Sequence, residues 1–189
     1  MIWGNNMFYN IFRLITKLVM VFFRVEIEGL ENIKKEGSLV IAGNHTKWLD
    51  PILLVSLSNR KISFLTKKEL FKGITKPIVK AMGCIPVDRK KHDHDALISA
   101  YKVLDDGGVI GIFPEGTINR TKDVILPFKI GAVKMANKTN TEIVPFVIKG
   151  KYKFLRKSIK IKFLKSIKIG NDLEKENKRL EDIISNNLR

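Results

Sequence analysis

Three short runs of this chain are apolar at every position instead of at every second one. They read LVIA at 39–42, VIGIF at 109–113 and IVPFVI at 143–148. A strand of this kind has no face suited to water, and it is typical of a parallel sheet that helices cover on both sides. This feature limits the chain to the layered α/β folds.

Helical segments separate these strands. Residues 93–106 carry apolar side chains at three-and-four spacing, and Gly107 and Gly108 then end the helix. Other helices are predicted at 51–57, 74–82, 131–138 and 172–188, and other strands within 25–29, 61–70, 83–89 and 159–163. The 189 residues fit one domain. The sequence therefore predicts a single layered αβα domain with a largely parallel (mixed) central sheet.

The N-terminal segment, residues 1–24, predicts an amphipathic helix ahead of that domain. Arg13, Lys17 and Arg24 fall on one side of a helical wheel. The opposite arc is apolar and consists of Ile11, Leu14, Ile15, Leu18, Val19 and Phe22. The apolar stretch is too short to span a bilayer, which takes roughly 20 residues, and it lacks the features of a signal peptide. Two interpretations stay open, because such a helix either packs on the core or lies in a membrane interface.

The chain is strongly basic, with a formal net charge of +16. This indicates an anionic partner such as phospholipid headgroups, a phosphorylated substrate or nucleic acid. Residues 1–89 and 151–189 each carry +7, whereas 90–150 carry +2. Residues 151–168 hold eight cations and no acid, with lysines alternating with apolar residues over 159–163. That pattern suits a strand with a cationic face, either a solvated edge or a docking surface for phosphates.

Neither a disulfide nor a metal site is expected. Cys84 is the only cysteine, which makes a reducing compartment the simplest setting, and we interpret it as a small buried residue. The three histidines show no spacing typical of zinc ligands. His92 and His94 are therefore interpreted as polar loop residues, and no bound cofactor is expected.

His45 and Asp50 stand five positions apart, between an apolar strand and a predicted helix. In the simpler interpretation, Asp50 is an N-cap ahead of Pro51 and His45 is an ordinary loop residue. In the other, the carboxylate holds the imidazole in one tautomer and the ring acts as a general base. The spacing alone favours the simpler interpretation, because both residue types are common in such loops.

Four segments, taken in chain order, favour the second interpretation, in which His45 and Asp50 act as a pair. They read NHTKWLD at 44–50, GCIPVDR at 83–89, FPEGT at 113–117 and IVPFVIKG at 143–150. Their order and spacing resemble the 1-acylglycerol-3-phosphate acyltransferases, also termed lysophosphatidic acid acyltransferases, and their glycerolipid acyltransferase relatives. With this resemblance, we interpret residues 1–24 as a membrane-interface helix and residues 25–189 as an acyltransferase domain.

The resemblance implies transfer of a fatty acyl group from a thioester, acyl-CoA or acyl-ACP, to the sn-2 hydroxyl of lysophosphatidic acid. His45 is the expected base, since neutral imidazole has a suitable proton affinity near pH 7. Asp50 fixes the ring and stabilises its charged form. The substrate hydroxyl attacks directly, so no nucleophilic side chain of the protein is needed.

The phosphate of the acceptor calls for fixed cationic donors. Arg89, which closes its motif, is the first candidate, and Lys67 resembles a second. A salt bridge to Asp88 or Glu69 is the structural alternative for Arg89. Lys47 stands where serine is common in the family, and it either contacts a phosphate or faces solvent.

The FPEGT motif is assigned by the resemblance to acceptor binding through Glu115, Gly116 and Thr117. A carboxylate repels phosphate, so Glu115 is expected to act indirectly, and Gly116 allows a close approach of the ligand. An arginine commonly follows this triplet, but Ile118 stands here. Arg120 is the candidate replacement for that contact.

The sequence thus predicts a peripheral enzyme on the cytoplasmic face of the cell membrane that makes phosphatidic acid for phospholipid biosynthesis. A sibling acyltransferase that uses glycerol-3-phosphate or another lysolipid is the nearer alternative, because of Ile118. A non-catalytic basic protein that binds membranes or nucleic acid is the other. Nucleic acid is not expected as a partner, since aromatics are not interleaved with the tail lysines.

Overall fold

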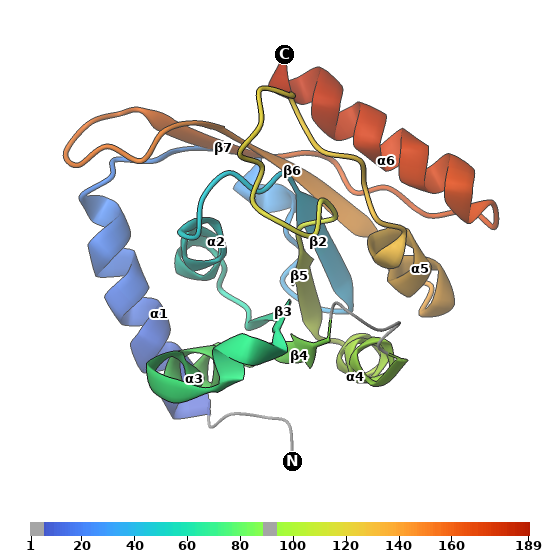
Figure 1. The fold of residues 1–189 in the computed structure, drawn as a ribbon, viewed down its shortest axis with the longest axis horizontal. Coiled ribbons are helices and arrows are strands. Elements are labelled where there is room, and N and C mark those ends of the chain that lie inside the picture. Colours follow the sequence, from blue (N-terminus) through green and yellow to red (C-terminus); the bar gives the residue numbers. More distant parts are fainter. Residues whose placement is uncertain (1–5, 89–93) are drawn as a thin grey trace.

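The computed structural model describes residues 6–88 and 94–189. Within this part of the chain, seven strands form one sheet in the order β1-β7-β6-β2-β5-β3-β4 (Figure 1). The strands are β1 (Glu26–Glu28), β2 (Leu39–Gly43), β3 (Ile62–Lys67), β4 (Ile85–Val87), β5 (Val109–Ile112), β6 (Ile143–Gly150) and β7 (Ile159–Phe163). Every neighbouring pair is parallel except β6 and β7. The predicted largely parallel, mixed sheet is confirmed.

Helices cover both faces of this sheet (Figure 1). One face carries α1 (Asn6–Val21), α2 (Asp50–Leu57) and α3 (Lys76–Ala81), and the other carries α4 (His94–Asp105), α5 (Gly131–Lys138) and α6 (Leu173–Leu188). Among the described residues, short 3₁₀ helices occur at η1 (Leu30–Asn32), η2 (Lys68–Phe71) and η3 (Gly73–Thr75). In β2, Leu39 and Ile41 pack into the first layer, whereas Val40 and Ala42 pack into the second. The predicted αβα layering is confirmed, because β2 is buried from both sides.

The carboxyl ends of β2, β5, β3 and β4 meet at one edge of the sheet, because these strands are parallel. Gly43, the last residue of β2, lies so close to β6 that a Cβ there would fall 2.4 Å from the Phe146 carbonyl oxygen. Glycine therefore lets β2 run to this edge without displacing β6. The loops that follow β2 and β5 leave the sheet here and carry the motifs at 44–50 and 113–117.

Helix α1 packs on the domain by a narrow face and leaves its apolar arc exposed. The Tyr9 hydroxyl donates to the Arg60 carbonyl oxygen at 3.2 Å and accepts from the Ile62 amide at 3.0 Å. Met20 is buried on the same side, and Arg13 donates to the carbonyl of Ser58. The exposed fractions along the arc run from 42% to 61%, at Ile11, Leu14, Ile15, Leu18, Val19 and Phe22. Packing on the domain and lying in a membrane interface are therefore compatible interpretations of this helix.

No helix within residues 6–88 and 94–189 combines the length and the apolar character needed to cross a bilayer.

Strand β7 is an interior strand, which makes the interpretation of the tail as a solvated edge wrong. Its apolar residues are buried, and β1 pairs with its outer side. Lys160 forms ion pairs with Glu26, at 2.9 Å between Nζ and Oε1, and with Glu28. Acids from β1 thus offset part of the cationic face. The exposed cations gather instead in the β6–β7 connection, at Lys151, Lys153, Arg156 and Lys157.

The structure confirms the prediction for Cys84 and contradicts the one for His94. Cys84 is buried, and burial raises the pKa of its thiol. His94 is the first residue of α4, so its interpretation as a loop residue is wrong, and His92 lies outside the described residues. In the part of the chain that the structure describes, no group of three His, Cys, Asp or Glu side chains is placed to hold a metal ion.

Candidate active site

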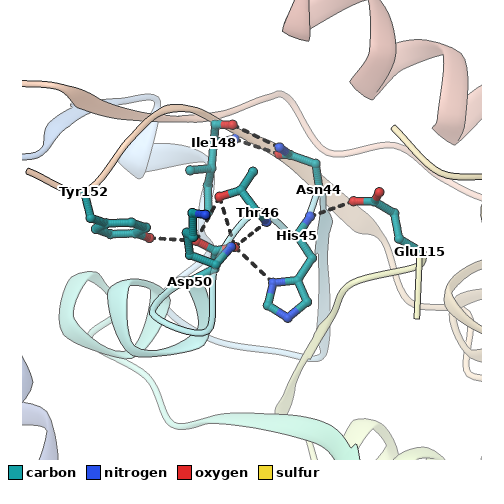
Figure 2. A network of polar contacts seen from close by, with 8 residues as sticks. Asn44, His45, Thr46, Asp50, Glu115, Ile148 and Tyr152 are labelled. Atoms are coloured by element: carbon teal, nitrogen blue, oxygen red, sulfur yellow. Dashed lines mark hydrogen bonds and ion pairs between the residues drawn. The ribbon is translucent and has the colours of Figure 1, made fainter. Parts of the chain in front are cut away.

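His45 stands two residues beyond the end of β2, where the chain turns toward α2 (Figure 2). Its backbone N–H donates to Glu115 Oε1 at 2.7 Å, and its carbonyl oxygen accepts from the Asn119 amide at 2.8 Å. The loop after β5 therefore holds the His45 backbone from both sides. The side chain is 15% exposed, and its Nδ1 lies 3.0 Å from Asp50 Oδ2.

Asp50 is completely buried and is the first residue of α2. Its Oδ2 accepts from the backbone amides of Thr46, at 2.6 Å, and Lys47, at 2.8 Å. Its Oδ1 accepts from the Tyr152 hydroxyl at 2.8 Å (Figure 2). The N-cap interpretation is wrong, because Leu49 holds the cap position and the carboxylate turns back into the loop. Donors from the loop and from Tyr152 thus compensate a buried anion.

The Asp50 carboxylate fixes the tautomer of His45. An ionised carboxylate only accepts hydrogen bonds, so in the neutral ring Nδ1 carries the proton and Nε2 keeps its lone pair. Among the described residues, Nε2 has no hydrogen-bond partner. The Phe113 ring stacks on the imidazole with 4.1 Å between centroids and 20° between planes. The ring is therefore held on two sides, with one basic nitrogen available to a substrate.

Asn44 fastens the start of this loop to β6. Its Nδ2 donates to the Ile148 carbonyl oxygen at 2.9 Å, and its Oδ1 accepts from the Ile148 amide at 2.8 Å (Figure 2). Sequence reasoning did not single out Asn44 or Tyr152. Asn44 carried a signal, because it is a polar residue directly after a run of buried ones. Tyr152 carried none, since it stands 102 positions from its partner Asp50.

Glu115 is 4% exposed and connects two loops. Besides accepting from His45 N, it accepts from the Leu126 amide through Oε2 at 2.8 Å. Burial raises the pKa of the Glu115 carboxyl, and the two backbone donors act in the opposite direction. Both oxygens already accept a backbone N–H, which agrees with an indirect role in acceptor binding.

The other predicted binding residues surround this centre more loosely. Gly116 has φ +70°, and a Cβ there would fall 2.9 Å from Cε of Lys129, whose side chain lies across the glycine. Lys129 is a nearby cation that sequence reasoning did not name as a site residue. Thr117 and Arg120 are exposed in the same loop.

Lys67 and Arg89 are the remaining predicted phosphate donors. Lys67 is exposed at the end of β3, in register with Val87 of β4. Arg89 lies outside the described residues. The structure thus brings together His45, Asp50 and Glu115, and it places Lys67 at the same edge of the sheet.

A comparison with known families decides what kind of protein carries this pair. The profile of the Acyltransferase family matches residues 24–149. The chain belongs to this acyltransferase family. The match covers the motifs at 44–50, 83–89 and 113–117 and nearly all of the fourth, so the resemblance drawn from them is confirmed.

Two curated relatives of this acyltransferase carry the name 1-acyl-sn-glycerol-3-phosphate acyltransferase. The one from Borreliella burgdorferi is 35% identical over 139 residues, which cover 72% of this chain and 55% of the relative. The one from Bacillus subtilis is 34% identical over 128 residues, which cover 67% of this chain and 63% of the relative. The aligned part of this chain spans less than two thirds of the length of either relative.

The fold of the acyltransferase agrees with a solved structure. The crystal structure of the 1-acyl-sn-glycerophosphate acyltransferase PlsC from Thermotoga maritima superposes with a TM-score of 0.78 at 23% sequence identity. The superposition covers 95% of this chain and 78% of PlsC. The layered fold described above is therefore that of a known acyltransferase structure.

Proposed function

We propose that this acyltransferase moves a fatty acyl group from a thioester donor to the sn-2 hydroxyl of lysophosphatidic acid, giving phosphatidic acid for phospholipid biosynthesis. The observation that carries the proposal is the His45 ring, which Asp50 holds with Nε2 available at the loop edge of the sheet. The names of the curated relatives support lysophosphatidic acid as the acceptor.

The proposed reaction needs one proton carrier and no covalent enzyme intermediate. Nε2 of His45 takes the proton of the acceptor hydroxyl while the hydroxyl oxygen attacks the thioester carbonyl. The imidazolium that forms is stabilised by the buried Asp50 carboxylate. When the carbon–sulfur bond breaks, the proton passes to the leaving thiolate, which departs as a free thiol. No protein nucleophile and no bound cofactor take part, and acyl-CoA or acyl-ACP serves as co-substrate.

The acceptor phosphate is proposed to bind at the edge of the sheet where the carboxyl ends of β3, β4 and β5 meet. Lys67, Arg89 and Arg120 supply cationic donors, and Gly116 and Thr117 supply a loop that a ligand can approach closely. Lys129, which lies across Gly116, adds a further cation to this group.

Replacing Arg89 by alanine should raise the apparent KM for the acceptor about tenfold or more and leave kcat nearly unchanged. The reason is that a phosphate contact acts in the ground state and in the transition state alike. Initial rates at saturating donor measure the effect. Arg179→Ala on the surface of α6 is the matched control. A variant with the wild-type KM would remove Arg89 from the phosphate site.

The membrane surface is proposed to bind the apolar arc of α1 together with the β6–β7 connection, on the cytoplasmic side. Figure 1 shows this connection beside the C-terminal end of α1. Phe154 stacks on Phe22 with 5.5 Å between centroids, and both rings are about half exposed or more. Four exposed cations flank Phe154. An apolar surface bordered by cations suits a bilayer interface with anionic headgroups.

Changing Leu14 and Leu18 together to glutamate should weaken binding to anionic vesicles about a hundredfold. Both side chains are roughly 60% exposed, so the change spares the core, and burying each leucine contributes about 1.5–3 kcal/mol. Vesicle co-sedimentation measures binding, with thermal unfolding as the check on folding. Ile98→Glu, equally exposed on α4, is the matched control. Equal sedimentation of the double variant and the wild type would show that α1 is not the anchor.

An acceptor panel tests the proposed function itself. The protein is incubated with vesicles and with labelled acyl-CoA or acyl-ACP as the donor. Separate reactions contain lysophosphatidic acid, glycerol-3-phosphate or another lysolipid as the acceptor. Labelled phosphatidic acid is the expected main product. Preferred transfer to glycerol-3-phosphate would favour the sibling enzyme to which Ile118 points. Transfer to no acceptor, with either donor, would contradict the enzymatic function.

A further inference from the structure

Tyr152 contacts the candidate active site, although it stands 102 positions after Asp50 in the sequence. It lies in the β6–β7 connection, just beyond the end of β6. Its hydroxyl donates to Asp50 Oδ1 at 2.8 Å, whereas His45 contacts the other oxygen, Oδ2 (Figure 2). The carboxylate is therefore held between the base on one oxygen and the phenol on the other.

The Tyr152 hydroxyl is built to remain a donor. Burial, followed by the negative charge of Asp50, raises the pKa of the phenol far above its usual range. The hydroxyl thus keeps its proton at any pH at which an enzyme works. The backbone amides of Thr46 and Lys47 fix Oδ2, whereas Oδ1 accepts from the phenol at 2.8 Å and from the Thr46 hydroxyl at the longer distance of 3.3 Å. The phenol is therefore the closer of the two donors that orient Oδ1.

Residues that follow α1 hold Tyr152 in place. The Phe23 ring meets the Tyr152 ring edge to face, with 5.7 Å between centroids and 88° between planes. Two residues further on, Phe154 stacks on Phe22, and the Leu155 amide donates to the Phe22 carbonyl oxygen at 2.6 Å. The segment 152–155 therefore contacts both the buried carboxylate and the end of the amphipathic helix.

We propose that Tyr152 is a positioning residue, which orients Asp50 for its hydrogen bond to His45 and connects this pair to the end of α1. The proposal rests on the proposed function for the reaction in which the pair acts. The hydroxyl bonds to Asp50 and not to the His45 ring, so its proposed action is through the carboxylate.

The direction of the expected pH effect follows from the groups around His45. Asp50 faces the ring from α2, Glu115 binds its backbone from the loop after β5, and Lys47 belongs to its own loop. Removing the Tyr152 hydroxyl leaves these three groups unchanged and takes one donor from the carboxylate. The carboxylate then attracts the protonated ring more strongly. The titration midpoint of the ring should move to higher pH.

The test compares Tyr152→Phe with the wild type, because this change keeps the ring that packs on Phe23. In NMR spectra without substrate, the His45 midpoint should move to higher pH, in line with the loss of one neutral donor to the carboxylate. With lysophosphatidic acid, kcat should fall about tenfold with the acceptor KM within about twofold, and the acid limb of the rate profile should move by the same amount. Tyr101→Phe on α4 is the matched control, and His45→Ala assigns the ring signal.

An unchanged His45 midpoint in Tyr152→Phe would overturn the proposal, even if the variant were slower, because a merely structural role lowers the rate without moving the titration. In an Asp50→Asn background, Tyr152→Phe should cause no further loss of rate, since the hydroxyl acts through that carboxylate. A further tenfold loss there would also overturn it. Failure of the wild type to acylate lysophosphatidic acid would contradict the proposed function alone, and the NMR midpoint would still decide the role of Tyr152.

Discussion

Replacing His45 by alanine abolishes acyl transfer, by about 10³-fold or more in kcat, and leaves the protein folded. The loss is large because Nε2 of this ring is the proposed proton acceptor, and general-base catalysis contributes about 10²–10⁴-fold. The fold survives because the ring projects from a loop at the sheet edge, where Asn44 and Glu115 hold the backbone independently of the side chain. Turnover with lysophosphatidic acid and the thermal unfolding midpoint measure the two halves of the prediction.

His94→Ala provides the matched control for this substitution. His94 is exposed at the start of α4, and its removal deletes the same chemical group from another part of the surface. The control should keep the wild-type rate. A His45→Ala protein that turns over as fast as this control would exclude His45 as the base.

Replacing Asp50 by alanine should lower both activity and stability. The carboxylate is fully buried and accepts from Thr46, Lys47, Tyr152 and His45, so its loss leaves several partly buried donors without an acceptor. Each unsatisfied donor costs about 1–3 kcal/mol, which predicts a loss of about 3–5 kcal/mol in the free energy of unfolding. In addition, kcat should fall about 10³-fold, since the ring loses the group that fixes its tautomer.

The Asp50 prediction separates catalytic from structural loss through a second variant. Asp50→Asn keeps the size of the side chain but presents an amide to donors that need acceptors, so it should be nearly as inactive and less destabilised. Denaturant unfolding and initial rates measure both variants. Asp105→Asn, at the exposed end of α4, is the matched control. An Asp50→Ala protein with wild-type unfolding energy would contradict the described burial network.

The sequence predicted the sheet well, because continuous apolar runs report burial on both faces. It predicted less about contacts between distant segments. The cationic face of 159–163 was open to two interpretations, a solvated edge or a docking surface, since residues 151–168 hold no acid. Glu26 and Glu28, which offset Lys160, come from β1 at the other end of the chain. Only the pairing of β1 with β7 brings these charges together.

In the candidate site, too, the sequence predicted local features better than contacts between distant segments. The motif at 44–50 indicated that His45 and Asp50 act together, and the geometry places them in contact. Local rules placed Asp50 as a helix cap, but loop amides and Tyr152 draw the carboxylate away from the helix. The helical wheel of α1 gave the apolar arc correctly. It gave no sign that the opposite, more polar side would pack on the domain, because Tyr9 and Arg13 satisfy their hydrogen bonds only against α2 and β3.

The most direct test of the proposed mechanism compares two pH dependences of the wild-type protein. One is the kcat/KM for phosphatidic acid formation from lysophosphatidic acid, and the other is the NMR titration of the His45 ring in the free protein. If neutral His45 is the base, kcat/KM rises with a slope of one proton, and its midpoint coincides with that of the ring. A rate that does not vary with pH across the His45 titration would contradict the assignment of His45 as the base.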